Sequence, residues 1–370
     1  MPADNKTYLS NGQVLASPPL SVRILRFFEN IYFFLGLYFV SLFSLDPYTA
    51  AQNSQFNVSR SGNRHNARPR WGGSGPSSGG GGGGGGPGGG FGPRRIGRVS
   101  TYSSTMTLPA NNAEWGAVIS SYKDQLPEVY PVYQTPLPSS VNRYIDHTQL
   151  SLDATDEDID KLCAEAAKYN FAAVCVRLRH VRRAVTNLQS SPECTVACVV
   201  GFPEGTHDTM EKEKEALDAA ELGASELDMV INWPKLKEGQ YMDVYADVLE
   251  VRKGAPSPVK LKVILETSQL TKDEIIAGSV ISSMAGADFV KTSTGFKGAG
   301  ANVDDVAMMR AVVELVGKGT KVKASGGVRS AEDCIKMLKA GADRIGTSSG
   351  VNIVNQLAGK ETQPATPAAY

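Results

Sequence analysis

Eight short runs of β-branched and apolar residues recur in the last two thirds of the chain, and amphipathic stretches separate them. The runs are 143–148, 172–176, 195–202, 226–231, 260–267, 288–293, 322–327 and 344–349. The clearest amphipathic stretches are 155–170, 209–224 and 330–342. The first and last of these open with a Thr or a Ser that can cap a helix N-terminus. Strands that alternate with helices in this way predict parallel pairing.

The number of strands favours a closed sheet. Eight strand–helix units within about 210 residues indicate an α/β protein with a (β/α)8 TIM barrel. An open, doubly wound sheet is the alternative, but no GxGxxG sequence follows a first strand. We expect the barrel over residues 141–356, an extension over 110–140 that packs on its outside, and a disordered tail over 357–370.

Charge and cysteine content exclude some classes of function. Lys plus Arg and Asp plus Glu both total 38, so no overall charge recruits nucleic acid. The five cysteines all follow residue 160. They form no CxxC pair with histidines at the spacing of a zinc site, so we expect no zinc site. We expect reduced thiols, with Cys175 and Cys198 as small core residues.

The N-terminal third differs in composition from the rest. Residues 27–45 form an apolar run with a single acid, which predicts a transmembrane helix within an N-terminal segment 1–50. A cleaved signal peptide is the alternative, although no small-residue cleavage site follows. More arginines follow the run than precede it, which favours a cytoplasmic C-terminal side. Asn5-Lys6-Thr7 is then a candidate glycosylation site.

A Gly/Arg/Pro-rich segment follows over residues 51–109. Its polyglycine tract, within 68–98, has no side chains to pack and loses the most backbone entropy on ordering. We expect a disordered linker between the membrane segment and the barrel.

Ionisable residues stand near the C-terminal ends of several predicted strands, where barrel enzymes place their catalytic groups. They are Asp146, Thr148, Asp228, Glu266, Lys291 and Lys323, counting the Thr hydroxyl with them. Lys291 lies within the run "DFVKTS" and Lys323 in the next run, so the two amines can face one cavity. Mutual repulsion and burial both lower an amine pKa, which predicts a neutral lysine nucleophile and Schiff-base chemistry. Lys321 lies nearer the bottom of its strand and is expected to be exposed.

Glycine-rich turns after the last strands predict a phosphate site. "ASGGVR" (324–329) and "GTSSG" (346–350) follow the two strands whose loops often bind phosphate in such barrels. "STGF" (293–296) adds another glycine. The candidate phosphate-binding residues are Gly295, Gly326, Gly327, Arg329, Gly346, Ser348 and Ser349.

The motifs "IDHTQL", "GFPEG", "ELDMVIN", "KVILET", "DFVKTSTGF", "VKASGGVR" and "RIGTSSG", in this order, resemble those of the deoxyribose-phosphate aldolase family of class I aldolases. The resemblance implies Lys291 as the Schiff-base lysine and Lys323 as the lysine that lowers its pKa. It implies Asp228 as the proton-relay carboxylate, supported by Asp146 and Thr148.

The implied reaction is reversible cleavage of 2-deoxy-D-ribose 5-phosphate to D-glyceraldehyde 3-phosphate and acetaldehyde. The iminium serves as electron sink, so neither metal nor organic cofactor is expected. One departure from the family is "CVRLRHV", where Arg177 and Leu178 stand at the pocket rim in place of an aromatic residue or Asn followed by Pro.

Residues 1–100, with "SNGQVL" and "PRRIGR", resemble the selenoprotein K family of single-span endoplasmic-reticulum proteins, although this region has no Cys after its glycine tract. The resemblance implies a cytoplasmic catalytic domain anchored to that membrane through residues 27–45. A membrane adaptor that carries an inactive barrel stays open as an alternative. So does a join of two genes, with translation of the enzyme starting near Met106, and a homodimer is compatible with the sequence.

Overall fold

The computed structural model describes residues 8–10, 13–15, 108–133 and 140–360. The chain divides into two units, Met1–Ser100 and Thr101–Tyr370. In the first unit, β1 (Tyr8–Ser10) pairs antiparallel with β2 (Gln13–Leu15). The predicted membrane helix, the predicted linker up to residue 107 and the end of the tail lie outside the described residues. Among the helices of the described part, none is long and apolar enough to cross a membrane.

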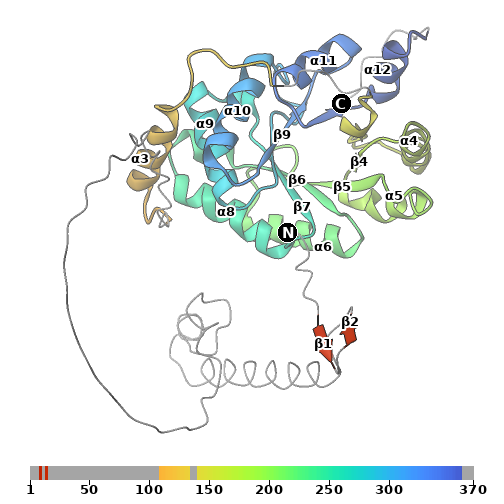
Figure 1. The fold of residues 1–370 in the computed structure, drawn as a ribbon, viewed down its shortest axis with the longest axis horizontal. Coiled ribbons are helices and arrows are strands. Elements are labelled where there is room, and N and C mark those ends of the chain that lie inside the picture. Colours follow the sequence, from red (N-terminus) through yellow and green to blue (C-terminus); the bar gives the residue numbers. More distant parts are fainter. Residues whose placement is uncertain (1–7, 11–12, 16–107, 134–139, 361–370) are drawn as a thin grey trace, which may run out of the picture. The chain divides into compact units, whose positions relative to one another are not determined.

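In the second unit, eight parallel strands of the described part close into a barrel in the order β10-β3-β4-β5-β6-β7-β8-β9. Figure 1 shows the helices arranged around these strands. The strands are β3 (Ile145–Thr148), β4 (Ala173–Val176), β5 (Thr195–Val200), β6 (Glu226–Val230), β7 (Lys260–Ile264), β8 (Phe289–Lys291), β9 (Lys321–Ser325) and β10 (Arg344–Thr347). The predicted TIM barrel is confirmed, and the open doubly wound sheet is excluded.

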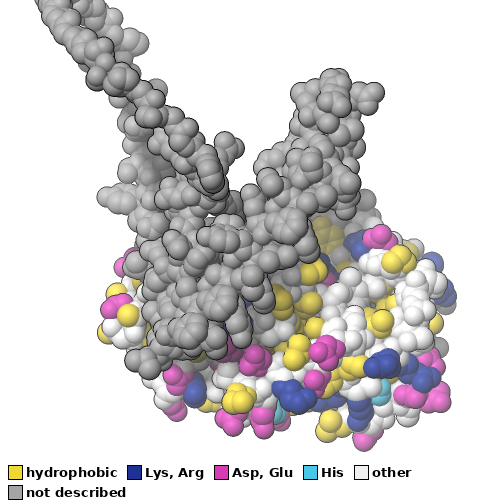
Figure 2. All heavy atoms as spheres, turned by 90° about the horizontal axis from the view of Figure 1, so that it is seen from below, with side chains coloured by type: hydrophobic (Ala, Val, Ile, Leu, Met, Phe, Trp, Pro, Cys, Tyr) yellow, Lys and Arg dark blue, Asp and Glu magenta, His cyan; other side chains and the backbone are white. Residues whose placement is uncertain are grey.

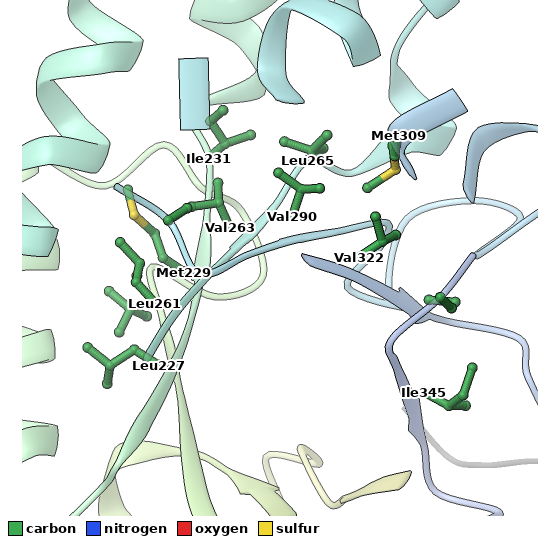
Figure 3. Packing of buried hydrophobic residues seen from close by; sticks show 14 of the residues in the cluster. Leu227, Met229, Ile231, Leu261, Val263, Leu265, Val290, Met309, Val322 and Ile345 are labelled. Carbon is green, nitrogen blue, oxygen red and sulfur yellow. The ribbon is translucent and has the colours of Figure 1, made fainter. Parts of the chain in front are cut away.

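Side-chain alternation along the strands separates two environments. Leu227 and Met229 of β6 and Leu261 and Val263 of β7 belong to the apolar layer that packs against the helices (Figure 3). The residues between them point to the other face, into the barrel. A central strand of this kind is buried on both faces, so the polar side chains inside the barrel are removed from water as well.

Helices follow the strands, and several of them begin at a residue whose side chain caps the helix. The helices are α4 (Asp156–Tyr169), α5 (Val181–Asn187), α6 (Thr209–Glu221), α7 (Trp233–Lys237), α8 (Tyr241–Gly254), α9 (Lys272–Met284), α10 (Val303–Val316), α11 (Ala331–Lys339) and α12 (Gly350–Leu357). The predicted caps are present, because Thr155 and Ser330 form reciprocal capping boxes with Asp158 and Asp333. Acidic and basic side chains are interspersed on the face that Figure 2 shows.

A helix within the extension was not predicted. α3 (Asn112–Lys123) packs against α8, α9 and α10, and the fully buried ring of Trp115 lies 5.1 Å from that of Tyr245. Trp115, Ile119 and Tyr122 are its buried residues, which is a spacing of four and three. That short stripe is difficult to recognise beside the prolines that follow.

Candidate active site

Seven buried ionisable side chains of the described barrel are linked by ion pairs, and we call this set the interior charge cluster. It consists of Asp146, Glu226, Asp228, Lys262, Lys291, Lys323 and Arg344. The strand register brings them together, since Asp228 lies opposite Lys262 and Lys291 lies opposite Lys323. Burial in this low-dielectric space makes each unpaired charge costly, so each carboxylate contacts more than one cation.

Lys291 is the last residue of β8, and only 2% of its surface is exposed. Its Nζ lies 2.8 Å from Oδ2 of Asp228. Burial lowers the pKa of Lys291, and the neighbouring ammonium of Lys323 lowers it further, whereas Asp228 opposes the shift. The net shift of the Lys291 pKa is downward, which is the direction that the sequence led us to expect.

Lys323 has the opposite tendency. Its Nζ lies 2.6 Å from Asp146 and 2.8 Å from Asp228. Burial alone would lower the pKa of Lys323, but these two carboxylates outweigh it and raise the pKa. The pKa values of the two lysines therefore shift in opposite directions, that of Lys291 downward and that of Lys323 upward.

Three of the predicted site residues lie deeper in the barrel than expected. Asp146, Asp228 and Lys323 stand within β3, β6 and β9 rather than at the C-terminal ends of these strands, so that part of the prediction was wrong. Burial would raise the pKa of Asp228, but Lys262, Lys291 and Lys323 together hold it well below the usual range. The pKa of Asp146 is also lowered, by Lys323 and Arg344, against the same effect of burial.

Sequence reasoning missed Lys262, Glu226 and Arg344. The ammonium of Lys262 lies 2.6 Å from Asp228 and 2.7 Å from Glu226, and these carboxylates raise its pKa despite its complete burial. The alternation of side chains along a strand was a usable signal for two of them. In "ELD", Glu226 is on the same strand face as Asp228, and in "KLK", Lys262 is on the same face as Lys260.

Beside the cluster lies an apolar wall, formed by Leu150, Cys175, Ala197, Val199, Phe202, Val230, Ile264 and Phe296. The rings of Phe202 and Phe296 meet edge to face, with centroids 5.1 Å apart. The Cys175 Sγ lies 3.9 Å from Asp228, and burial raises the pKa of this thiol to about 11. The wall keeps the reacting space poor in water.

Two predicted residues have other contacts. The Thr148 hydroxyl donates to the carbonyl of Asp146 at 3.0 Å. Glu266 is buried with a positive φ of 61°, and it accepts hydrogen bonds from the amide and hydroxyl of Thr294. Burial raises the pKa of Glu266. Glu266 thus braces the loop after β8 and does not join the ion pairs of the cluster.

The predicted phosphate loops approach one another closely. The amide of Ala301 donates to the carbonyl of Gly326 at 3.0 Å, and a Cβ on Gly326 would lie 3.0 Å from the Cα of Gly300. Gly295 and Gly326 both have positive φ, 90° and 88°. Only glycine allows this packing without strain, so three glycines bring two loops to the same edge of the barrel.

The other predicted phosphate residues are distributed around that edge. Gly327 and Arg329 are exposed before α11, while Ser348 and Ser349 are half-buried before α12. Gly346 lies within β10, where a Cβ would stand 2.9 Å from the Cε of Lys323. The absence of a side chain at Gly346 therefore makes room for Lys323, and its contact with phosphate stays a prediction.

Residues 141–356 match the model of a family described as DeoC/LacD family aldolase. The chain belongs to this family. A region that includes this DeoC/LacD domain is 55% identical over 248 residues to the deoxyribose-phosphate aldolase of Coccidioides immitis, a match that covers 66% of this chain and 92% of that one. It is 48% identical over 215 residues to the Brevibacillus brevis enzyme of the same name, covering 58% and 95%.

Solved structures resemble the DeoC/LacD domain as well. A putative deoxyribose-phosphate aldolase from Coccidioides immitis superposes with a TM-score of 0.65 at 54% identity, covering 67% of this chain and 98% of that chain. The aldolase from Aeropyrum pernix, described as a tetramer, gives 0.55 at 31% identity, covering 65% and 97%. Outside the DeoC/LacD domain, residues 7–111 match a model described as Selenoprotein SelK_SelG.

Proposed function

We propose that the protein is a deoxyribose-phosphate aldolase, which reversibly cleaves 2-deoxy-D-ribose 5-phosphate to D-glyceraldehyde 3-phosphate and acetaldehyde in deoxyribose phosphate catabolism. The observation that carries the proposal is the pair of buried lysines, Lys291 and Lys323, that share the Oδ2 atom of Asp228. The pKa of Lys291 is lowered and that of Lys323 is raised, and these opposite directions suit a nucleophilic amine beside a proton donor in Schiff-base catalysis.

Lys291 begins the reaction as the nucleophile. Its uncharged amine attacks the aldehyde carbon of the open-chain sugar, and the carbinolamine loses water to give an iminium. Lys323 stays protonated because Asp146 and Asp228 hold it, so it can donate a proton to the departing hydroxyl.

Cleavage then needs a base at the sugar C3 hydroxyl. Asp228 accepts this proton through a water molecule, with Lys323 and the supporting Asp146 and Thr148 beside it. As the oxygen becomes a carbonyl, the C2–C3 bond breaks and its electron pair moves into the iminium, giving an enamine. A proton returns to C2 of the enamine, and hydrolysis releases acetaldehyde and the free Lys291 amine. The iminium supplies the electron sink, so the reaction uses neither a metal nor an organic cofactor.

The phosphate of the substrate fits the glycine-rich edge of the barrel. Backbone amides of Gly295, Gly326 and Gly327 and the first turn of α12 provide donors for an anion. Arg329, Ser348 and Ser349 add side-chain donors, and Gly346 opens space below. Binding energy at this remote group positions the reacting carbons over Lys291.

Borohydride trapping tests the proposal. With acetaldehyde, reduction should add a stable ethyl group to one lysine of the wild-type protein, identified as Lys291 by peptide mass. Lys291→Ala should give no adduct, and Lys291→Arg should also be inactive because guanidinium stays protonated. Lys321→Ala is the matched control, since Lys321 is exposed two residues before Lys323 and should trap normally. A wild-type protein without an adduct would contradict the proposal and favour an inactive barrel.

The match to the SelK_SelG model supports a second proposal. We propose that residues 27–45 anchor the chain in the endoplasmic-reticulum membrane with the barrel on the cytoplasmic side, beyond the linker 51–109. Carbonate extraction of native membranes should leave the protein in the pellet, while deletion of 27–45 should release it. Recovery of the intact chain in the supernatant would argue against anchoring.

We also propose that the barrel forms a homodimer, and light scattering on the purified chain measures its molar mass.

A further inference from the structure

The interior charge cluster of the described barrel contains unequal numbers of opposite charges. Its carboxylates are Asp146, Glu226 and Asp228, and its cationic side chains are Lys262, Lys291, Lys323 and Arg344. Lys260 also approaches Glu226, at 3.4 Å, but 47% of its side chain is exposed, so water screens it. Within this cluster, three buried carboxylates thus face four buried cations, and one cation lacks a full counter-charge.

Arg344 is a member of the cluster that has no ion pair with Asp228, the carboxylate that contacts Lys291. It is the first residue of β10, whereas Lys291 is the last residue of β8. Its guanidinium contacts Asp146 at 2.5 Å and Glu226 at 3.2 Å, and it lies 5.6 Å from the ring of Phe289. Guanidinium keeps its proton throughout the working pH range. Arg344 therefore stays positively charged and partly neutralises two carboxylates, those of Asp146 and Glu226.

The other ion pairs of the cluster show which lysine amine has the fewest carboxylate partners. Lys262 contacts Glu226 and Asp228, and Lys323 contacts Asp146 and Asp228. In the described structure, Lys291 has an ion pair with Asp228 alone, and that carboxylate is shared with both other lysines. The other ionisable groups near Lys291 are the thiol of Cys175 and the carboxyl of Glu266, which is hydrogen-bonded to Thr294.

We propose that Arg344 is a positioning residue that keeps the Lys291 amine uncharged, by engaging the carboxylates of Asp146 and Glu226. This inference rests on the proposed aldolase function. Without the guanidinium, Asp146 and Glu226 would attract Lys323 and Lys262 more strongly. Asp228 would then be free to hold Lys291 as an ammonium, and removal of one positive charge nearby favours that ammonium too.

Two variants with opposite expected signs test the proposal. The measurement is the acidic limb of the pH dependence of kcat/KM for 2-deoxyribose 5-phosphate, which reports loss of a proton from the free enzyme. Arg344→Met removes a cation, so the limb should move to higher pH by about one unit. Glu226→Gln removes an anion, so the limb should move to lower pH. The double variant Arg344→Met/Glu226→Gln again has one more cation than carboxylates in the cluster, as the wild type has. Its acidic limb should therefore return toward the wild-type position.

Arg344→Lys keeps the charge with a different shape, and its limb should stay near that of the wild type. A purely structural role for Arg344 would lower stability and activity without moving the limb in either variant, and this result would overturn the inference. If Arg344→Met does not fold, Glu226→Gln and the double variant still decide the sign. Acetaldehyde trapping in the wild type separates the two claims: its failure contradicts the aldolase, whereas normal trapping with unmoved limbs contradicts only the role of Arg344.

Discussion

Lys260 and Lys262 stand two residues apart on β7 and point to the same side, yet their surroundings differ. Lys260 is half exposed and contacts Glu226 at 3.4 Å. Lys262 is fully buried and contacts Glu226 and Asp228 at 2.7 and 2.6 Å. The strength of an ion pair depends on its access to water, so these two lysines should contribute very unequally.

We predict that Lys262→Met lowers the free energy of unfolding by about 3–5 kcal/mol, because it leaves two buried carboxylates short of a cation. Lys260→Met should cost about 0–1 kcal/mol, as expected of a half-exposed pair. Urea denaturation of both variants measures the difference. Equal losses would contradict the assigned burial of Lys262.

At this scale the sequence located Lys291, Lys323, Asp228 and Asp146 but not Lys262. The local sequence does not show whether a lysine within a strand is buried, because the same pattern occurs around a lysine at a solvent-exposed rim. The four were found because they fall in motifs with known chemistry. Lys262 needed the register, which places it opposite Asp228.

At the scale of elements, two helices begin with equivalent capping boxes but follow different loops. Thr155 and Asp158 begin α4, which follows β3. Ser330 and Asp333 begin α11, which follows the loop with Gly326, Gly327 and Arg329. A cap fixes the direction in which the chain enters a helix, so the second box also orients a proposed phosphate loop.

We predict that Ser330→Ala and Thr155→Ala each lower the free energy of unfolding by about 1 kcal/mol. Only Ser330→Ala should also raise KM for 2-deoxyribose 5-phosphate, with acetaldehyde trapping unchanged, because the trapping reagent has no phosphate. Thermal denaturation and steady-state kinetics on the pair measure both effects. An equal rise of KM in the two variants would argue against a phosphate role for the loop before α11.

Element prediction succeeded where amphipathic period and caps coincide, as for α4 and α11, and failed for α3. Only three residues of α3 are buried, Trp115, Ile119 and Tyr122, and the helix lies beside a proline-rich segment. The helix is stabilised by its position against α8, α9 and α10, where Trp115 is buried, and such tertiary stabilisation leaves little local signal.

At the scale of the whole barrel, the buried carboxylates link folding to pH. The pKa values of Asp146, Asp228 and Glu226 are lowered in the folded state. In an unfolded chain, Asp titrates near 3.8 and Glu near 4.5. The unfolded state therefore binds more protons in acid, and the stability that these carboxylates contribute is present above those values and lost as pH falls toward the folded ones.

We predict that the urea midpoint of unfolding is nearly constant from about pH 7 to pH 5 as far as these groups are concerned, and falls steeply below about pH 4. Midpoints measured by circular dichroism at a series of pH values test this. A midpoint that already declines steeply between pH 7 and pH 6 would assign the dependence to other groups.

The sequence by itself determined the alternation of eight strands with helices, the closed barrel and the motifs around Lys291 and Lys323, because periodicity, caps and glycine turns are local properties of the chain. Only the tertiary structure decided how deep the charges lie and which of them pair. Closure of the sheet brings Arg344 of the last strand to Asp146 of the first, and it places three lysines around Asp228. These contacts join residues far apart in the chain, and their strengths depend on the exclusion of water, which no local pattern records.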